Sequence, residues 1–128
     1  KYCMKKNVIL CLVLAALAAC NSSSPKDEKT GKTTGDITQH PDYQKGLTLV
    51  TKNKCLTCHA IDETITGPPY REVAKKYASY PDTIVSHLAG KIISGGNGVW
   101  GEIFMTPHPD VSKEEAETMV KYILLLKK

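Results

Sequence analysis

Residues 55–59 read Cys55-Leu56-Thr57-Cys58-His59, a C-x-x-C-H pentapeptide. Two thiols three positions apart can each add to one vinyl group of a haem, and the adjacent histidine can then bind the iron through its imidazole. The pentapeptide therefore predicts one c-type haem, covalently bound through Cys55 and Cys58, with His59 as the fifth iron ligand.

Three other uses of this cysteine pair fit the sequence less well. A structural zinc site needs four ligands, and the chain offers neither a second such pair nor an H-x-x-x-H pattern. A thioredoxin-like redox pair follows a strand in an α/β pattern, and the sequence shows no such pattern. A disulfide between Cys55 and Cys58 would close a very small loop and leave His59 unexplained. We therefore prefer the haem interpretation.

The candidates for a sixth iron ligand are methionines and histidines of the domain: Met105, Met119, His40, His87 and His108. Met119 belongs to an apolar stripe with helical spacing, which predicts core packing. His87 lies in another helical stretch, and His40 stands at the edge of the domain. Met105 follows a Gly-rich segment and precedes a Pro-stiffened turn, so its thioether is the preferred ligand. His108, three residues further on, remains its competitor.

Four segments have the spacing of amphipathic helices, and no stretch shows the sustained alternation of a sheet strand. They cover about residues 41–53, 69–80, 81–94 and 112–128. The last one begins with Ser112 as N-cap and Glu115 three residues later, the pattern of a capping box. Gly46, inside the first segment, predicts a close approach of the last helix with Tyr122 packing across it; simple tolerance of the glycine, or an early end of the helix, is the alternative. The predicted fold class is all-α.

Besides the pentapeptide, three further segments support a resemblance to a known family. They are Gly46-Leu47, Thr66-Gly67-Pro68-Pro69-Tyr70, and Gly98-Val99-Trp100-Gly101 followed by Met105-x-Pro. With these segments, the region from about Pro41 to Lys128 resembles a class I cytochrome c of the short bacterial monohaem type. The resemblance implies a fold of about four helices around one covalently attached haem.

The resemblance also implies roles for individual residues. The carbonyl of Pro68 accepts the N–H of His59, Met105 is the sixth iron ligand, and Trp100 donates its indole N–H to a haem propionate. Core packing is the alternative role for Trp100. One departure from the family is the turn from Met105 to Pro109, which is about one residue longer than usual and places His108 near the haem edge.

The start of the chain has the composition of an export signal. Lys5-Lys6 precede the 12-residue apolar run Val8–Ala19, which is too short to span a bilayer as a stable helix. Residues 17–20, Leu-Ala-Ala-Cys, resemble the bacterial lipobox, which predicts that Cys20 becomes lipidated after cleavage. Met4 is the expected start of translation, which would make residues 1–3 non-native.

The sequence thus divides into three parts. We expect an export signal peptide over residues 1–19, the lipidated cysteine and a flexible tether over 20–38, and the cytochrome c domain over 39–128. Three of the 17 basic residues precede Cys20, which leaves 14 basic against 13 acidic side chains in the rest of the chain. This near-equal number of basic and acidic side chains lacks the excess positive charge of a nucleic-acid-binding domain, so no nucleic-acid partner is predicted.

An iron with two protein ligands has no open position for a substrate, which predicts an electron carrier and not an enzyme. We expect a monomer, attached by lipid at Cys20 to a membrane on the periplasmic side. It would shuttle single electrons between membrane respiratory complexes and a terminal oxidase or reductase. The alternatives are a haem peroxidase or gas sensor in which Met105 dissociates, or the haem module of a larger respiratory complex.

Overall fold

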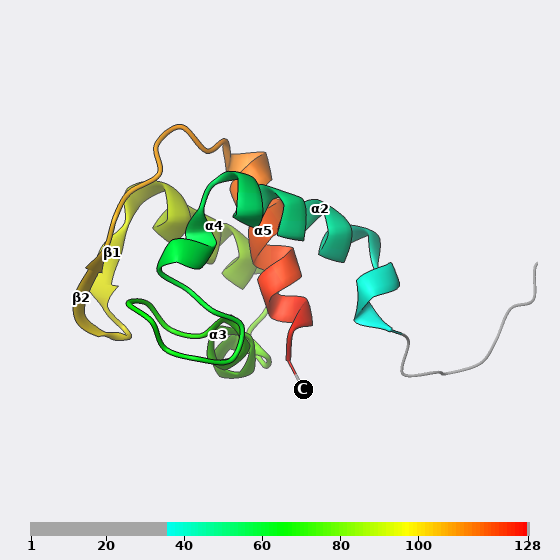
Figure 1. Cartoon of the computed structure of the whole chain (residues 1–128), viewed down its shortest axis with the longest axis horizontal. Coiled ribbons are helices and arrows are strands. Elements are labelled where there is room, and N and C mark those ends of the chain that lie inside the picture. Colours follow the sequence, from blue (N-terminus) through cyan, green and yellow to red (C-terminus); the bar gives the residue numbers. More distant parts are fainter. Residues whose placement is uncertain (1–35, 128) are drawn as a thin grey trace, which may run out of the picture. The chain divides into compact units, whose positions relative to one another are not determined.

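The computed structural model describes residues 36–127. In chain order the elements are the 3₁₀ helix η1 (Ile37–Gln39), α2 (Pro41–Lys52), the 3₁₀ helix η2 (Cys55–Thr57), α3 (Tyr70–Tyr77), α4 (Thr83–Ser94), β1 (Gly96–Gly98), β2 (Gly101–Met105) and α5 (Lys113–Leu125). Figure 1 shows their arrangement. The predicted signal peptide, Cys20 and the tether up to residue 35 lie outside the described residues. The last predicted tether residue, Thr38, lies in η1, so the described secondary structure includes the end of the predicted tether.

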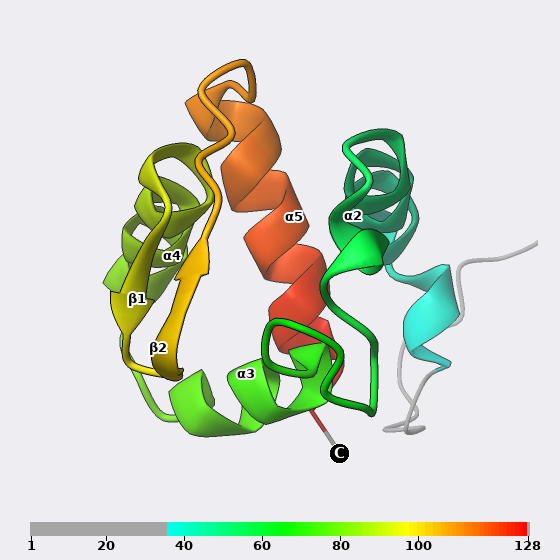
Figure 2. The ribbon, with the colours of Figure 1, turned by 60° about the vertical axis from the view of Figure 1, so that its left-hand side comes forward.

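The all-α prediction is confirmed, and α2 to α5 coincide with the four predicted helical segments. Helix α5 is the central element, because α2, α3 and α4 all contact it. Figure 2 shows α2 and α4 on opposite sides of α5 and α3 across its C-terminal end. Among the described residues, no helix combines the length and apolar character needed to cross a membrane.

The Gly-rich segment before Met105 contains two strands, although the sequence shows no strand alternation there. It forms a two-stranded antiparallel hairpin in which Gly96 pairs with Met105 and Gly98 with Gly101, with a register shift between the two pairs. The strand pattern was not visible in the sequence because β1 consists of Gly96, Asn97 and Gly98, residues that are depleted in strands. The hairpin extends the all-α fold without forming a separate layer.

The start and the buried face of α5 confirm two predictions. Ser112 Oγ accepts the backbone N–H of Glu115 at 3.2 Å, and the Glu115 carboxylate accepts the backbone N–H of Ser112 at 3.3 Å, which completes the capping box. Met119 is 1% exposed in the apolar core, together with Val50, Tyr122 and Val120. Core packing of Met119 therefore follows the helical spacing of its neighbours.

Helices α2 and α5 cross at Gly46. A Cβ atom at this position would overlap Tyr122 and would lie 2.8 Å from the carbonyl oxygen of Thr118. The ring of Tyr43, nearly one turn earlier in α2, meets the ring of Tyr122 edge to face at 5.1 Å. The predicted close approach is confirmed, and only glycine permits it at this distance.

Candidate functional site

A cavity of about 410 Å³ lies between the helices and the hairpin. Side chains from α3, α4, the hairpin, α5 and the C-x-x-C-H segment all line it, including Tyr70, Leu88, Phe104 and Met119. Its volume falls within the range of cofactor pockets, and mainly apolar walls with a few polar groups are typical of such sites. The sequence-predicted residues Cys55, Cys58, His59, Pro68, Trp100 and Met105 all belong to its lining.

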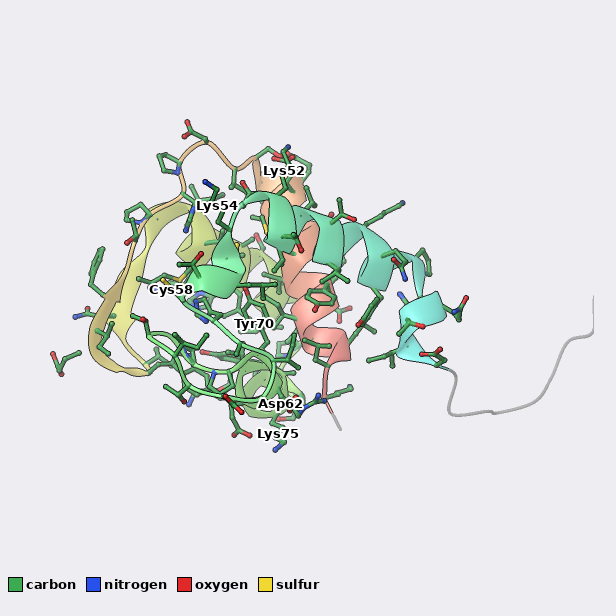
Figure 3. All side chains as sticks on the ribbon, viewed as in Figure 1. Lys52, Lys54, Cys58, Asp62, Tyr70 and Lys75 are labelled. Carbon is green, nitrogen blue, oxygen red and sulfur yellow. The ribbon has the colours of Figure 1, made fainter. Side chains whose placement is uncertain are left out.

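The turn after α2 directs both cysteines into this cavity. Lys54 adopts a left-handed backbone conformation with φ of 57°, which ends α2 and starts η2. The backbone N–H groups of Cys58 and His59 then both donate to the carbonyl of Cys55, at 3.2 and 3.1 Å. Both thiols are free, and burial raises the pKa of the Cys55 thiol. Figure 3 shows Lys54 and Cys58 on this segment and Tyr70 on α3.

His59 is held in one tautomer by its surroundings. Its Nδ1 lies 2.8 Å from the carbonyl oxygen of Pro68, which can only accept a hydrogen bond. Nδ1 therefore carries the proton, and Nε2 keeps its lone pair for a metal ion. The ring also stacks on Tyr70, with centroids 5.1 Å apart and an interplanar angle of 17°.

Gly67 provides the space for the His59 ring, a role that sequence reasoning missed. A Cβ at residue 67 would overlap the imidazole and would lie 2.8 Å from Nδ1. The backbone N–H of Gly67 donates to the carbonyl of Cys58 at 2.8 Å, so the Pro68 loop is fixed to the haem-binding segment. The available signal was the position of Gly67 directly before Pro68. Sequence reasoning also did not assign Tyr70 to the site, because its place in the same segment was the only sequence feature that pointed to it.

Met105 reaches the cavity from the end of β2 and is half-buried. Its position depends on the start of β1, because Gly96 is its pairing partner. Gly95, which follows α4 with φ of 69°, packs so closely on the Met105 carbonyl that a Cβ there would overlap it. The backbone after α4 thus holds the segment that contains Met105.

The other ligand candidates have different surroundings. His40 lies outside the cavity lining and caps α2, since its Nδ1 accepts the backbone N–H of Asp42 at 3.2 Å. His87 is an exposed residue of α4 at the cavity. His108 is half-buried and also lines the cavity, while its backbone N–H donates to the carbonyls of Ile92 and Ile93 at 3.1 Å. His108 therefore stays a competitor to Met105 by position.

Trp100 lies in the turn of the hairpin and remains 43% exposed while it lines the cavity. Among the described residues, Trp100 is not part of the buried core cluster. Lys76 Nζ lies over the indole, 5.4 Å from the ring centroid. Two other basic residues of α3 are paired elsewhere: Arg71 with Asp62 and the Leu126 carbonyl, and Lys75 with Glu72.

The chemistry of the donor set fits a covalently bound haem. Two free thiols approach the cavity from one short turn, and beside them lies a histidine whose Nδ1 is taken up by the Pro68 carbonyl, which leaves Nε2 as the ring nitrogen available to a metal ion. The rest of the wall includes large apolar side chains, such as Ile103 and Phe104, which suit a flat apolar macrocycle. Cys55 and Cys58 would hold the group through thioether bonds, and His59 would bind its iron.

Comparisons with known proteins agree with this geometry. Residues 43–127 match the family model for cytochrome c. The chain is 40% identical to cytochrome c-552 of Nitrosomonas europaea over 84 residues, which cover 66% of this chain and 81% of that protein. It is 43% identical to cytochrome c-551 of Azotobacter vinelandii over 81 residues, or 63% of this chain and 96% of that protein. The crystal structure of wild-type Nitrosomonas europaea cytochrome c552 aligns with a TM-score of 0.60 at 41% identity, covering 63% of this chain and 99% of that one.

Proposed function

Because this chain belongs to the cytochrome c family, we propose that it carries single electrons on a haem iron ligated by His59 and Met105. It is a small electron-carrying c-type cytochrome of the short bacterial monohaem type, with one haem covalently bound through Cys55 and Cys58. The His59 and Met105 ligation is the finer part of the proposal. The observation that supports it is that both side chains line one cavity, with the Nδ1 proton of His59 bound by Pro68.

The bound haem supplies a one-electron couple, and a methionine ligand raises its reduction potential. Pro68 orients the imidazole through the hydrogen bond to Nδ1, which keeps His59 in the same position in both oxidation states. Apolar residues around the cavity lower the local polarity, which further favours the less charged reduced form. Two protein ligands leave no position for a substrate, so we propose no catalytic activity.

The ferric absorption spectrum tests the ligation. A weak methionine-to-iron charge-transfer band is expected in the wild type and in His108→Ala, and it should be absent in Met105→Ala. Added cyanide should bind slowly to the first two proteins and rapidly to Met105→Ala. Absence of the band from the wild type, or a band that persists in Met105→Ala, would contradict the proposal. Rapid cyanide binding by the wild type would instead favour the peroxidase or gas-sensor alternative.

We further propose that the protein is exported and attached by lipid at Cys20 to a membrane on the periplasmic side, where it acts as a monomer. The basic pair Lys5-Lys6, the apolar run up to Ala19 and the cysteine that follows support this. Its partners would be a membrane respiratory complex as donor and a terminal oxidase or reductase as acceptor. Cys20→Ser should move the holoprotein from the membrane fraction to the soluble fraction, and an unchanged membrane fraction would contradict the anchor.

A further inference from the structure

The contact between Lys76 and Trp100 joins two walls of the haem cavity. Lys76 lies in the last turn of α3, whereas Trp100 lies in the turn of the hairpin, and the ammonium nitrogen is 5.4 Å from the centroid of the indole. We propose that Lys76 is a positioning residue that holds the tip of the hairpin, and through it Met105, against the haem. The Met105 part of this inference rests on the proposed His59 and Met105 ligation.

Among the described residues, the indole of Trp100 is the partner found for the Lys76 ammonium. Lys75, the neighbouring residue, pairs with Glu72 at 2.9 Å on the outer surface of α3. None of the ion pairs found among residues 36–127 includes Lys76, whose ammonium instead lies over the face of Trp100. A cation over an indole face is attracted by the ring quadrupole, most strongly for tryptophan.

Besides the haem, whose cavity Val99 and Trp100 line, the described residues hold the tip of the hairpin through the Lys76 contact and the hydrogen bond from Asn97 to the Glu102 carbonyl. Val99 and Trp100 are the turn residues, and they are 54% and 43% exposed. They are flanked by Gly98 and Gly101, with φ of 100° and 105°, conformations that glycine adopts freely. Figure 2 shows this turn beside one end of α3. A tip with exposed residues and flexible flanks is a natural place for local opening.

Opening of the tip affects the iron ligand because strand β2 connects the tip to Met105. Trp100 directly precedes β2, and β2 ends at Met105. The pairing of Gly98 with Gly101 lies next to the tip, and the pairing of Gly96 with Met105 lies at the other end of the hairpin. When Lys76 holds Trp100, fraying from the tip is suppressed before it reaches Met105. Loss of the contact should therefore increase the fraction of molecules in which Met105 has left the iron.

Tryptophan fluorescence of the holoprotein tests the contact itself. The chain has one tryptophan, and energy transfer to the haem quenches its emission more strongly when the ring is close. Lys76→Met keeps the aliphatic stem but removes the charge, and it should increase the emission. Lys76→Arg should restore the quenching because a guanidinium also binds an indole face. Lys75→Met, the control for loss of one charge from α3, should leave the emission unchanged. Equal emission from Lys76→Met and wild type would overturn the proposal.

Cyanide binding to the ferric holoprotein tests the effect on Met105. Lys76→Met should bind cyanide about two- to fivefold faster than wild type, equivalent to about 0.5–1 kcal/mol for an exposed cation–π contact. Lys76→Arg and Lys75→Met should bind at the wild-type rate. An unchanged rate in Lys76→Met, with increased emission, would overturn the link from the tip to Met105. A wild-type rate equal to that of Met105→Ala would refute the proposed ligation instead, and the emission of Trp100 would still decide the role of Lys76.

Discussion

Gly46 of α2 lies so close to Tyr122 of α5 that a Cβ on residue 46 would overlap the tyrosine side chain. The same Cβ would lie 2.8 Å from the backbone oxygen of Thr118, which cannot move without displacing α5. Helix propensity favours alanine over glycine by about 1 kcal/mol in a helix interior. Close packing at the crossing opposes that gain, so the two effects predict opposite signs for the same substitution.

Gly46→Ala should lower the free energy of unfolding of the holoprotein by about 1–3 kcal/mol, the usual cost of overpacking a well-packed core. Gly90→Ala is the matched control, since Gly90 lies in α4 and a Cβ there would meet nothing within 4 Å. The control should raise the free energy of unfolding by about 0.5–1 kcal/mol. Urea titrations of both variants give the comparison. A Gly46→Ala protein as stable as Gly90→Ala would show that α5 can move aside at little cost.

The features that could be predicted from sequence are those with a local pattern. Ser112 and Glu115 are three residues apart, and a capping box depends only on that spacing. The C-x-x-C-H turn and the Pro68 carbonyl likewise depend on short segments, whose resemblance to a known family placed them together. The crossing at Gly46 was predictable because a glycine inside a helix requires a packing reason.

The hairpin and the Lys76–Trp100 contact could not be predicted in the same way. The residues of β1 have low strand propensity, and their extended conformation depends on pairing with β2 and on glycines with positive φ. Lys76 and Trp100 are brought together by the fold of two elements that are separated by α4. The sequence around each of these residues contains no local pattern that indicates a contact with the other. Gly67 was missed because its role is to leave space for His59, and its position before Pro68 does not by itself indicate which side chain fills that space.

Gly67→Ala should displace the imidazole of His59. The added methyl group would overlap the ring, and moving the ring away would lengthen its 2.8 Å hydrogen bond to Pro68. We expect the holoprotein to lose about 1–3 kcal/mol of unfolding free energy, with Gly90→Ala again as the control. The Nδ1 proton of the reduced protein, observed by NMR, should also exchange faster with solvent. Unchanged stability and unchanged exchange together would refute the steric role of Gly67.

The left-handed backbone of Lys54 predicts a stabilising substitution. A non-glycine residue at φ of 57° costs about 1–2 kcal/mol relative to glycine, and part of this is offset by the greater freedom of glycine in the unfolded chain. Lys54→Gly should therefore raise the unfolding free energy by about 0.5–1 kcal/mol. Lys54→Ala removes the same charge but keeps the backbone strain, so it should not stabilise the protein. Equal stabilisation by both variants would assign the effect to the charge.

The surroundings of Glu115 predict how the free energy of unfolding depends on pH. The backbone N–H of Ser112 and, secondarily, Lys52 at 3.5 Å hold the pKa of its carboxyl below the usual value of 4.5. A carboxyl whose pKa is lower in the folded state stabilises the fold above its unfolded pKa, and this contribution is lost as the pH falls through the folded pKa. Glu115→Gln keeps a hydrogen-bonding side chain but cannot titrate. The stability difference between wild type and Glu115→Gln, from urea midpoints, should thus be largest above about pH 5 and shrink below it. A difference that is constant from neutral to strongly acidic pH would contradict the role of the carboxylate.

Removal of the haem should unfold most of the domain. The cavity of about 410 Å³ separates the helices from the hairpin, and each of these elements contributes to its wall. Without the haem, apolar lining residues such as Ile103 and Phe104, which are 65% and 58% exposed, would stay in contact with water, at a cost of about 25 cal/mol per Å² of apolar surface.

The variant Cys55→Ala/Cys58→Ala cannot attach the haem and should lose most of its helical signal in far-ultraviolet circular dichroism. Cys20→Ser, which leaves the C-x-x-C-H segment intact, should keep the full signal of the holoprotein. If part of the core stays folded without the haem, we expect it to be the part between α2 and α5, which includes Val50 and Val120. These two helices contact each other directly, across the Gly46 crossing. Helical signal near the native level in the double variant would mean that this α2–α5 core is sufficient for the fold without the haem.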